Sequence, residues 1–284
     1  MRRFVVAALA LTVGASVPAC SQRQRSKLET TLATALVSEA EEREIGRQVH
    51  KELEKQGVTY VKQALVTQYV EEITERLATE VKREGAPDRI KVYVIDDPEM
   101  VNAFATPGGR LYVFSGLLLT AEDEAEVAGV IGHELGHIVA KHPAKRIALA
   151  MGYEALANLA LGKDPGQLQQ LAAVLLGGGV LAAHGRGEEN EADRLGLTWL
   201  HRAGYDPRGM VRFFRRIKDL SADPPAVLAW LYSHPTTTSR IEHVREMLRR
   251  RGWEGGEEGV EAHREVREAI LDAQRPRRAR GGGT

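Results

Sequence analysis

Cysteine is nearly absent from this sequence, since Cys20 is the only one in 284 residues. A single cysteine cannot form a disulfide within the chain, so an exported protein of this composition depends on packing or on a bound metal for its stability. A surplus of positive charge is also lacking, because 39 basic residues balance 39 acidic ones. Proteins that bind nucleic acid generally carry such a surplus, and we therefore expect no nucleic-acid partner.

Apolar runs long enough to cross a bilayer are missing as well. The longest runs are residues 4–13 and 171–183, whereas a membrane-spanning helix needs about 20 apolar residues. The first run follows Arg2 and Arg3 and precedes a stretch of small residues, which is the order of a secretory signal peptide. The second run contains three glycines and is interpreted as part of a buried helix.

The end of this leader has two interpretations. Residues 17–20 read Val-Pro-Ala-Cys and resemble a bacterial lipoprotein cleavage box, which predicts that residues 1–19 are removed and that Cys20 is lipidated. Residues 20–37 then form a polar tether, and Ser21 favours sorting to the outer membrane. On this interpretation the protein is a periplasm-facing lipoprotein of the bacterial cell envelope that meets the membrane only through its lipid anchor. The alternative is a soluble periplasmic protein.

Signals for helices and strands alternate over the first half of the remaining chain. Capping residues and apolar spacing predict two helices, at 38–57 with Ser38 as N-cap and at about 67–84. A change to period-2 spacing predicts a strand at 90–95 and a β-hairpin at 102–114 around the Pro-Gly-Gly turn 107–109.

Only helices are expected after the hairpin. Thr120 and the acids after it predict a helix start, and the helix should run to about His142, before Pro143. Further helices are predicted up to residue 183 with a break at 162–166, at 188–204, after Asp206-Pro207, and weakly at 260–274. These elements predict an α+β fold, mainly α-helical, with a small sheet or hairpin before the central helix. We expect one domain at 38–252, followed by a C-terminal helix and flexible tail at 253–284.

The stretch GHELGHIVAKH, residues 132–142, carries the first sign of chemistry. His133 and His137 are four residues apart and point to the same side of a helix, where two imidazoles can occupy two corners of a zinc tetrahedron. Glu134 stands beside them, and Gly132 and Gly136 suit the close approach of another segment. The competing interpretation is an ordinary helix with a solvated His/Glu face. A metal site would need a third ligand from elsewhere in the chain.

A second helix start, 189–193, offers that ligand. Glu189 and Asp193 are one turn apart, so one carboxylate can bind a metal while the other accepts a hydrogen bond from the far nitrogen of a ligand histidine. Acidic residues at a helix start are also common on exposed faces, and Glu191, which points elsewhere, fits that alternative.

Taken together, the motifs resemble a known family. HELGH, ENEADRLGLTWLHRAGYDP, Ser233-His234-Pro235 and Arg240-Ile241 stand in the order found in metallopeptidase family forty-eight, the HtpX-, BepA- and CAAX-prenyl-protease-like zinc endopeptidases of the gluzincin type. The likeness runs from about residue 39 to residue 250. It implies a zincin-like metalloprotease domain.

The resemblance also implies roles for individual residues. His133, His137 and Glu189 match the ligands of one zinc ion per chain, and Glu134 matches the general base that acts on a zinc-bound water. Three further positions match the family, namely Asp193 as the carboxylate behind a ligand, His234 as the histidine that approaches the metal from a loop, and Arg186 before the Glu-x-x-x-Asp motif. His234 is expected either to stabilise the oxyanion or to occupy the open zinc position at rest.

An extended substrate is expected to pair with the hairpin edge formed by Asn102, Ala103, Phe104 and Ala105, because β-augmentation orients a backbone without demanding a sequence. The function predicted for the chain is cleavage of unfolded or misassembled envelope proteins. The alternative is a chaperone or assembly lipoprotein whose zinc site is latent or blocked by a histidine. The other histidines are expected to be structural or solvated, and His184 deserves particular notice because it lies near Glu189.

Overall fold

The computed structural model describes residues 37–82, 90–177, 184–220, 228–235 and 238–274. The predicted signal peptide, Cys20, the tether before residue 37 and the last ten residues lie outside this part of the chain. The described helices are α2 (Glu39–Lys55), α3 (Ala64–Val81), α4 (Ser115–Thr120), α5 (Glu124–Val139), α6 (His142–Met151), α7 (Tyr153–Ala160), α8 (Pro165–Gly177), α9 (Arg186–Arg202), α10 (Arg208–Leu220), α11 (Leu228–Ser233), α12 (Thr238–Arg251) and α13 (Val260–Gln274). The fold is therefore mainly helical with a small sheet, as predicted.

The sheet has three strands, β1 (Lys91–Ile95), β2 (Ala103–Thr106) and β3 (Arg110–Phe114). Their order is β1-β3-β2, with β1 parallel and β2 antiparallel to β3. The predicted hairpin of β2 and β3 is confirmed, and its turn contains two glycines with positive φ, Gly108 and Gly109. Because β2 pairs with β3 alone, it forms an edge of the sheet.

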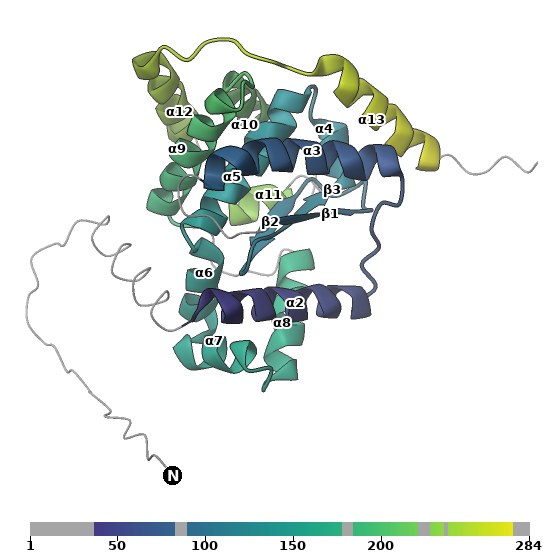
Figure 1. Ribbon diagram of the computed structural model, residues 1–284, viewed down its shortest axis with the longest axis vertical. Helices are drawn as coiled ribbons and strands as arrows, with labels where there is room; N and C mark the ends of the chain where they lie inside the picture. The colour runs from purple at the N-terminus through teal and green to yellow at the C-terminus, as the bar shows by residue number, and fades with distance from the viewer. Residues whose placement is uncertain (1–36, 83–89, 178–183, 221–227, 236–237, 275–284) are drawn as a thin grey trace, which may run out of the picture.

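Successive side chains along the strands point to opposite faces of the sheet and so divide the hydrophobic core into two parts. Val94, Leu111 and Val113 face the larger hydrophobic cluster, whereas Tyr112 and Phe114 face a smaller one. Helix α3 lies on the first side of the sheet and α2 on the second, with α7 and α8 beyond α2 (Figure 1). Both faces of the sheet are thus covered.

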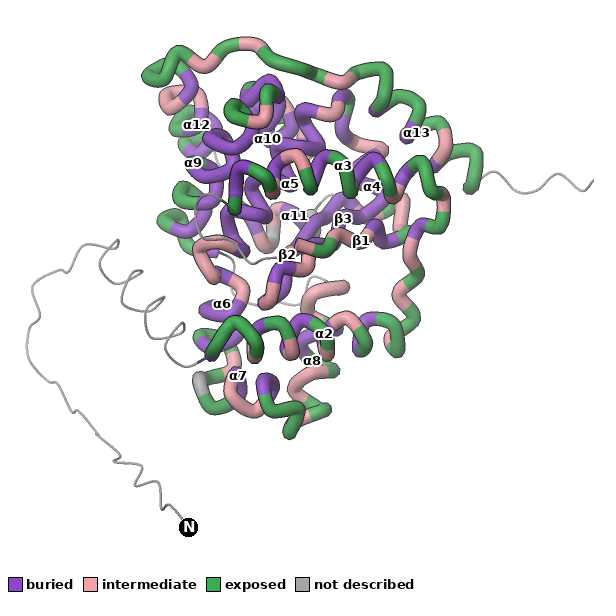
Figure 2. The backbone as a smooth tube through the Cα atoms, in the orientation of Figure 1, coloured by how far each residue is buried: buried purple, intermediate pink, exposed green. Residues whose placement is uncertain are grey.

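Helix α5 lies at the centre of the molecule, and every residue from Ala125 to Ile138 is buried. In Figure 2 α13, by contrast, is largely green. A Cβ on Gly136 would come within 2.7 Å of the Cα of Ala192 on α9, and one on Gly196 would meet the backbone of Gly132 at 2.8 Å. The predicted close approach of another segment to these glycines is confirmed, and that segment is α9.

Two boundaries of α5 differ from the prediction. Thr120 does not start the helix but ends α4, where its hydroxyl donates to the carbonyl of Gly116 at 2.8 Å. Asp123 is the N-cap instead, because its carboxylate accepts from the backbone N–H of Glu126 at 2.8 Å. At the other end the helix stops at Val139, and Pro143 belongs to the first turn of α6 rather than to a break after α5.

Helix boundaries elsewhere follow the predictions more closely. Ser38 caps α2 in a reciprocal arrangement with Glu41, as its sequence indicates. Helix α3 begins three residues before the predicted Thr67, and its predicted end after residue 82 lies outside the described residues. The apolar stretch after His142 is broken at Gly152 as well as near residue 162, since Gly152 adopts φ 93° between α6 and α7.

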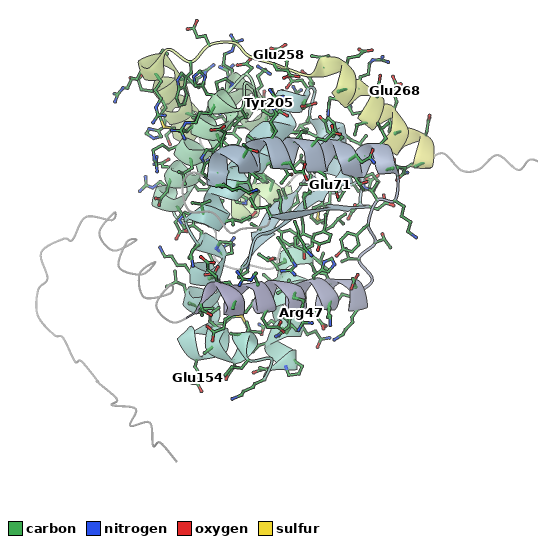
Figure 3. All side chains as sticks on the ribbon, viewed as in Figure 1. Arg47, Glu71, Glu154, Tyr205, Glu258 and Glu268 are labelled. Atoms are coloured by element: carbon green, nitrogen blue, oxygen red, sulfur yellow. The ribbon has the colours of Figure 1, made fainter. Side chains whose placement is uncertain are left out.

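Helix α13 is the predicted weak C-terminal helix, and it packs on the main core through Val266 and Ile270. Figure 3 shows Tyr205 and Glu258 at the end of the molecule near α13, and Glu154 on α7 at the opposite end. None of the described helices is both long enough and apolar enough to cross a membrane.

Candidate metal centre

Three elements bring four buried side chains to one point. His133 and His137 come from adjacent turns of α5, Glu189 from the first turn of α9, and His234 directly follows α11. Each of these residues is at most 2% exposed. The fold brings Glu189 next to the two histidines of α5, as predicted. Glu189 therefore does not lie on an exposed acidic helix face, which was the alternative. Glu191 is exposed, as expected.

The spacing of their polar atoms fits a tetrahedral ion. Nε2 of His137 lies 3.0 Å from Nε2 of His133 and 3.3 Å from a carboxylate oxygen of Glu189. The other Glu189 oxygen is 3.6 Å from Nε2 of His133. Four ligands at about 2.0–2.1 Å from zinc would be separated by roughly 3.3–3.4 Å along each edge of a tetrahedron. The donor set and its edges therefore suit zinc.

His234 stands at the fourth corner of this group. Its Nδ1 lies 3.2 Å from Nε2 of His133 and 3.1 Å from Oε1 of Glu189. The ring is stacked between Trp230, at 4.3 Å between centroids, and His184, at 5.0 Å. The burial of the ring lowers the pKa of His234 to about 4, so it is neutral near pH 7 and can present a lone pair.

Glu134 is placed beside the group but not in it. Oε1 of Glu134 lies 3.3 Å from Nε2 of His234. Burial, and then the neighbouring Glu189 carboxylate, raise the pKa of Glu134 well above its usual value, against the opposing effects of Arg146, Arg240 and a hydrogen bond from the Ala105 backbone. A buried carboxyl with a raised pKa is suited to exchanging a proton near neutral pH.

The far nitrogen of His133 meets a carboxylate, as expected from the sequence. Nδ1 of His133 is 2.8 Å from Oδ1 of Asp193, so the proton sits on Nδ1 and the Nε2 lone pair faces the group. Asp193 is held in turn by Arg240, which donates to both of its oxygens at 2.7 Å. Burial alone would raise the pKa of Asp193, but Arg240 lowers it, and the carboxylate stays charged.

Arg240 has a central position that the sequence did not assign. It also pairs with Glu189, and it is only 5% exposed. Burial alone would raise the pKa of Glu189, yet Arg240 and the nearby histidines hold it well below its usual value. The Arg-Ile pair was part of the family resemblance, and it was the available signal for this residue.

Two more histidines lie against the group. The His184 ring stacks on His137 with 3.8 Å between centroids, and Nδ1 of His142 is 2.8 Å from Nδ1 of His137. Both are buried, so neither is a solvated surface residue. Arg186 is exposed at the start of α9.

The edge strand β2 runs beside α5 and offers backbone groups to a partner. The N–H of Phe114 donates to the carbonyl of Asn102 at 3.0 Å, and bonded pairs alternate along an antiparallel ladder. The polar backbone groups of Ala103 and Ala105 therefore point away from β3. Phe104 instead pairs inward, and its ring stacks on Tyr112 with 4.7 Å between centroids.

Asn102 adds a polar group at the start of this edge. It is 6% exposed, and its side-chain oxygen has no hydrogen-bond partner among the described residues. A buried acceptor without a partner is costly unless a ligand supplies the donor. Of the four residues predicted to bind substrate, Ala103, Phe104 and Ala105 belong to β2 and Asn102 directly precedes it, and Ala103 and Ala105 are the ones whose backbone groups point away from β3.

Comparison with known proteins decides the family. Residues 64–248 match peptidase family M48. The chain belongs to this family. Its predicted membership, and with it the assignment to a class of zinc-dependent metallopeptidases, is confirmed.

Similar proteins of M48 come from bacteria and from mitochondria. The mitochondrial metalloendopeptidase OMA1 of Schizosaccharomyces pombe is 32% identical over 64% of this chain and 53% of its own length. The metalloprotease YcaL of Escherichia coli is 29% identical over 75% of this chain and 82% of its own length. The β-barrel assembly-enhancing protease of Escherichia coli is 28% identical over 86% of this chain and 52% of its own length. The chain thus spans only about half the length of the first and third of these M48 relatives.

Proposed function

We propose that this chain is a zinc-dependent endopeptidase that hydrolyses peptide bonds of unfolded or misassembled proteins in the bacterial envelope. The observation that carries the proposal is the position of the Glu134 carboxyl, next to a group of His133, His137 and Glu189 atoms spaced as zinc ligands. One zinc ion held by these three side chains would act as a Lewis acid that polarises the peptide carbonyl and acidifies water.

The chain's own residues would supply the proton transfers. Glu134 takes a proton from the attacking water and then passes it to the nitrogen of the leaving amine, which its raised pKa favours. Asp193 keeps the proton of His133 on Nδ1, so that Nε2 stays free to bind the metal. Arg240 compensates the charge of both carboxylates behind the site.

His234 would set whether the site is open. With Nδ1 at the fourth corner, it excludes water and substrate from that position. We propose that this is a resting arrangement and that His234 leaves the fourth corner before cleavage. From its new position its N–H can stabilise the oxyanion. The same observation favours the second candidate function, a chaperone or assembly lipoprotein whose blocked site binds polypeptides and rarely cuts them.

Cleavage of an unfolded protein such as casein tests both candidates. Glu134→Gln should lower the rate by about 10²- to 10⁴-fold while zinc content stays the same, because general base catalysis typically contributes that much. His234→Ala should cleave faster than the wild type, because vacating the fourth corner outweighs the loss of the N–H that is proposed to stabilise the oxyanion. If neither the wild type nor His234→Ala cut casein, yet both bound it, the chaperone would replace the peptidase.

The edge strand would orient the substrate. We propose that an extended polypeptide pairs with the outward backbone groups of Ala103 and with the carbonyl of Ala105, whose N–H is bonded to Glu134, and donates to the side chain of Asn102. Ala103→Pro removes an N–H that points away from β3 without breaking a bond to that strand, and circular dichroism checks that the fold survives the change at this fully buried position. We expect the substitution to raise KM for casein with little change in zinc content. Cleavage by this variant at the wild-type KM would count against strand pairing.

The location of the protein follows from the leader rather than from the fold. We propose lipidation at Cys20 and a periplasm-facing position, with the outer membrane as the favoured site. The name of the β-barrel assembly-enhancing relative agrees with work in the envelope. Mass spectrometry of the mature N-terminus would detect the lipid on Cys20, and an unmodified N-terminus after export would support the soluble alternative.

A further inference from the structure

His142 makes the shortest polar contact to His137 outside the ligand group. The two Nδ1 atoms are 2.8 Å apart, and His142 is 1% exposed. On its other side, Nε2 of His142 lies 3.8 Å from a carboxylate oxygen of Glu191. The side chain of Glu191 is 47% exposed, so these contacts lead from the buried centre to the surface.

These distances fix where the protons lie. Nε2 of His137 faces His133 and Glu189 and can bind a metal only if its proton is on Nδ1. Two nitrogens at 2.8 Å need one donor and one acceptor. Nδ1 of His137 therefore donates, Nδ1 of His142 accepts, and the proton of His142 sits on Nε2, towards Glu191.

We infer that His142 is a positioning residue for the metal, holding the ring and the tautomer of His137 as Asp193 holds those of His133. The inference rests on the zinc that the proposed function requires, but not on the reaction itself. In this centre one ligand histidine is backed by a carboxylate and the other by a neutral imidazole. The sequence shows the pattern as a third histidine five residues after the second.

The backbone between α5 and α6 is bent to make this contact. Lys141 has φ 55° and is the only non-glycine residue of the described chain with a positive φ. Such a conformation is strained for a residue with a Cβ, and strain of this kind persists where the surroundings require it. Here the bend at Lys141 turns His142 back towards the last turns of α5.

A second metal between His137, His142 and His184 is the competing explanation, because these three rings also lie close together. Two observations speak against it. The Arg146 guanidinium donates to Nε2 of His184 at 2.8 Å, which places a fixed positive charge at that site. If Nε2 of His137 binds the first ion, its Nδ1 carries the proton shared with His142 and has no lone pair for a second ion.

Zinc affinity, measured by competition with a chelator, tests the inference. The Glu134→Gln background prevents self-cleavage and keeps the metal ligands. His142→Leu should weaken zinc binding by about 10- to 100-fold, as loss of such partners usually does. His142→Asn should restore most of the affinity, because its side-chain oxygen can accept near the former Nδ1. His201→Leu, an exposed histidine on α9, is the control and should leave the affinity unchanged.

Several outcomes would overturn the inference. An unchanged affinity in His142→Leu, or an equal loss in the Leu and Asn variants, would show that the hydrogen bond does not matter. Two zinc ions per chain, reduced to one by His142→Leu or by His184→Leu, would establish the second metal site instead. If the wild type bound no zinc at all, the proposed function would be wrong. If zinc bound tightly whether or not His142 was present, only the inference about His142 would be wrong.

Nitrogen NMR of zinc-loaded protein labelled with ¹⁵N-histidine gives a readout that packing alone would not change. We expect a protonated Nδ1 on His137, hydrogen-bonded to a non-protonated Nδ1 on His142. In His142→Leu the His137 signal should shift, and it should return towards its wild-type position in His142→Asn. A His137 ring protonated on Nε2 instead would contradict the inference.

Discussion

The two ends of α5 both carry buried charged groups, and they differ in how these groups are satisfied. At the N-terminal end the carboxylates of Asp123, Glu126 and Asp206 are met by guanidinium groups of Arg212 and Arg216 at 2.8–3.0 Å. At the C-terminal end the carboxylates of Glu189 and Asp193 share Arg240, Glu134 lies beside them, and three histidines direct nitrogens towards one point.

This difference indicates that the cluster at the N-terminal end of α5 is structural. Bidentate and bridging arginines leave the carboxylates at the N-terminal end paired, so that end is complete without a ligand. At the other end Glu189 and Asp193 against Arg240 leave a formal charge of −1 among these three groups, and a cation bound by the histidine nitrogens and Glu189 would offset it. The buried cluster at the C-terminal end, whose negative charge is not fully compensated and whose lone pairs converge, is therefore the one expected to bind a metal.

Of the substitutions at the two ends of α5, removal of Arg240 should produce the largest loss of stability. Arg240→Leu leaves Glu189 and Asp193 buried without their guanidinium, which should lower the free energy of unfolding of the metal-free protein by about 3–5 kcal/mol. Added zinc should recover part of this loss, because the ion supplies positive charge at the same place. Urea denaturation of the Arg240→Leu protein and the wild type, with and without zinc, measures both the loss of stability and its recovery by the metal.

Arg249→Leu is the matched control for that experiment, since Arg249 lies on the same helix with its side chain 70% exposed. It should change the free energy of unfolding very little. An Arg240→Leu protein that zinc stabilised less than the wild type would contradict the view that arginine and metal compensate the same carboxylates.

A change at the N-terminal end should be smaller and independent of zinc. Asp206 is fully buried, and Asp206→Asn should cost about 1–3 kcal/mol by weakening charged hydrogen bonds. Burial alone would raise the pKa of Asp206, but hydrogen bonds from Arg208 and Arg212 hold it below its usual 3.8. Since the folded pKa is depressed, the stabilisation is complete above pH 3.8 and is lost as the pH falls through the folded pKa.

Denaturation at several pH values would follow that loss. The difference between wild type and Asp206→Asn should be constant near neutrality and shrink at acid pH. Glu258→Gln, whose side chain is 48% exposed and 3.7 Å from Arg212, should show almost no difference at any pH. A zinc affinity altered by Asp206→Asn would show that the two ends of α5 are coupled.

Two glycines of α5 that face α9 should differ from each other, and Gly132→Ala should have the smallest effect of all. Gly136→Ala would place a Cβ 2.7 Å from the backbone of Ala192, and such overpacking typically costs about 1–3 kcal/mol. Gly132→Ala meets its nearest atoms at 3.3–3.4 Å, and the better helix propensity of alanine offsets most of the strain. Thermal unfolding should separate the two variants, and equal midpoints would argue against a rigid contact between α5 and α9.

The sequence predicted the parts of this centre that depend on local periodicity. The four-residue spacing placed His133 and His137 on one face of α5, and the spacing in 189–193 indicated a ligand and its supporting carboxylate. The hairpin was predicted because a Pro-Gly-Gly turn separates two alternating runs. The helix pairing was foreseen in part, because glycines beside the histidines suggested close approach.

What escaped prediction depends on tertiary contacts. Arg240 lies 47 residues beyond Asp193 in sequence, and only the packing of α12 brings it under the site. The contact of His142 with His137 is likewise tertiary, because it depends on the bend at Lys141, which has no signal in the sequence. Thr120 was mistaken for an N-cap since Asp123, three residues later, competes for the same role.

His263 on α13 has a consequence for where this protein can be shortened. Its ring accepts from the hydroxyl of Tyr69 at 2.9 Å and donates to the carbonyl of Ala121 at 3.0 Å, joining α13 to α3 and to the turn before α5. The family match stops at residue 248, yet a fragment ending there would uncover the parts of α3 and α4 that α13 contacts and remove the hydrogen bond from His263 to the buried Ala121 carbonyl. A homology boundary and a folding boundary thus fall at different residues in this chain.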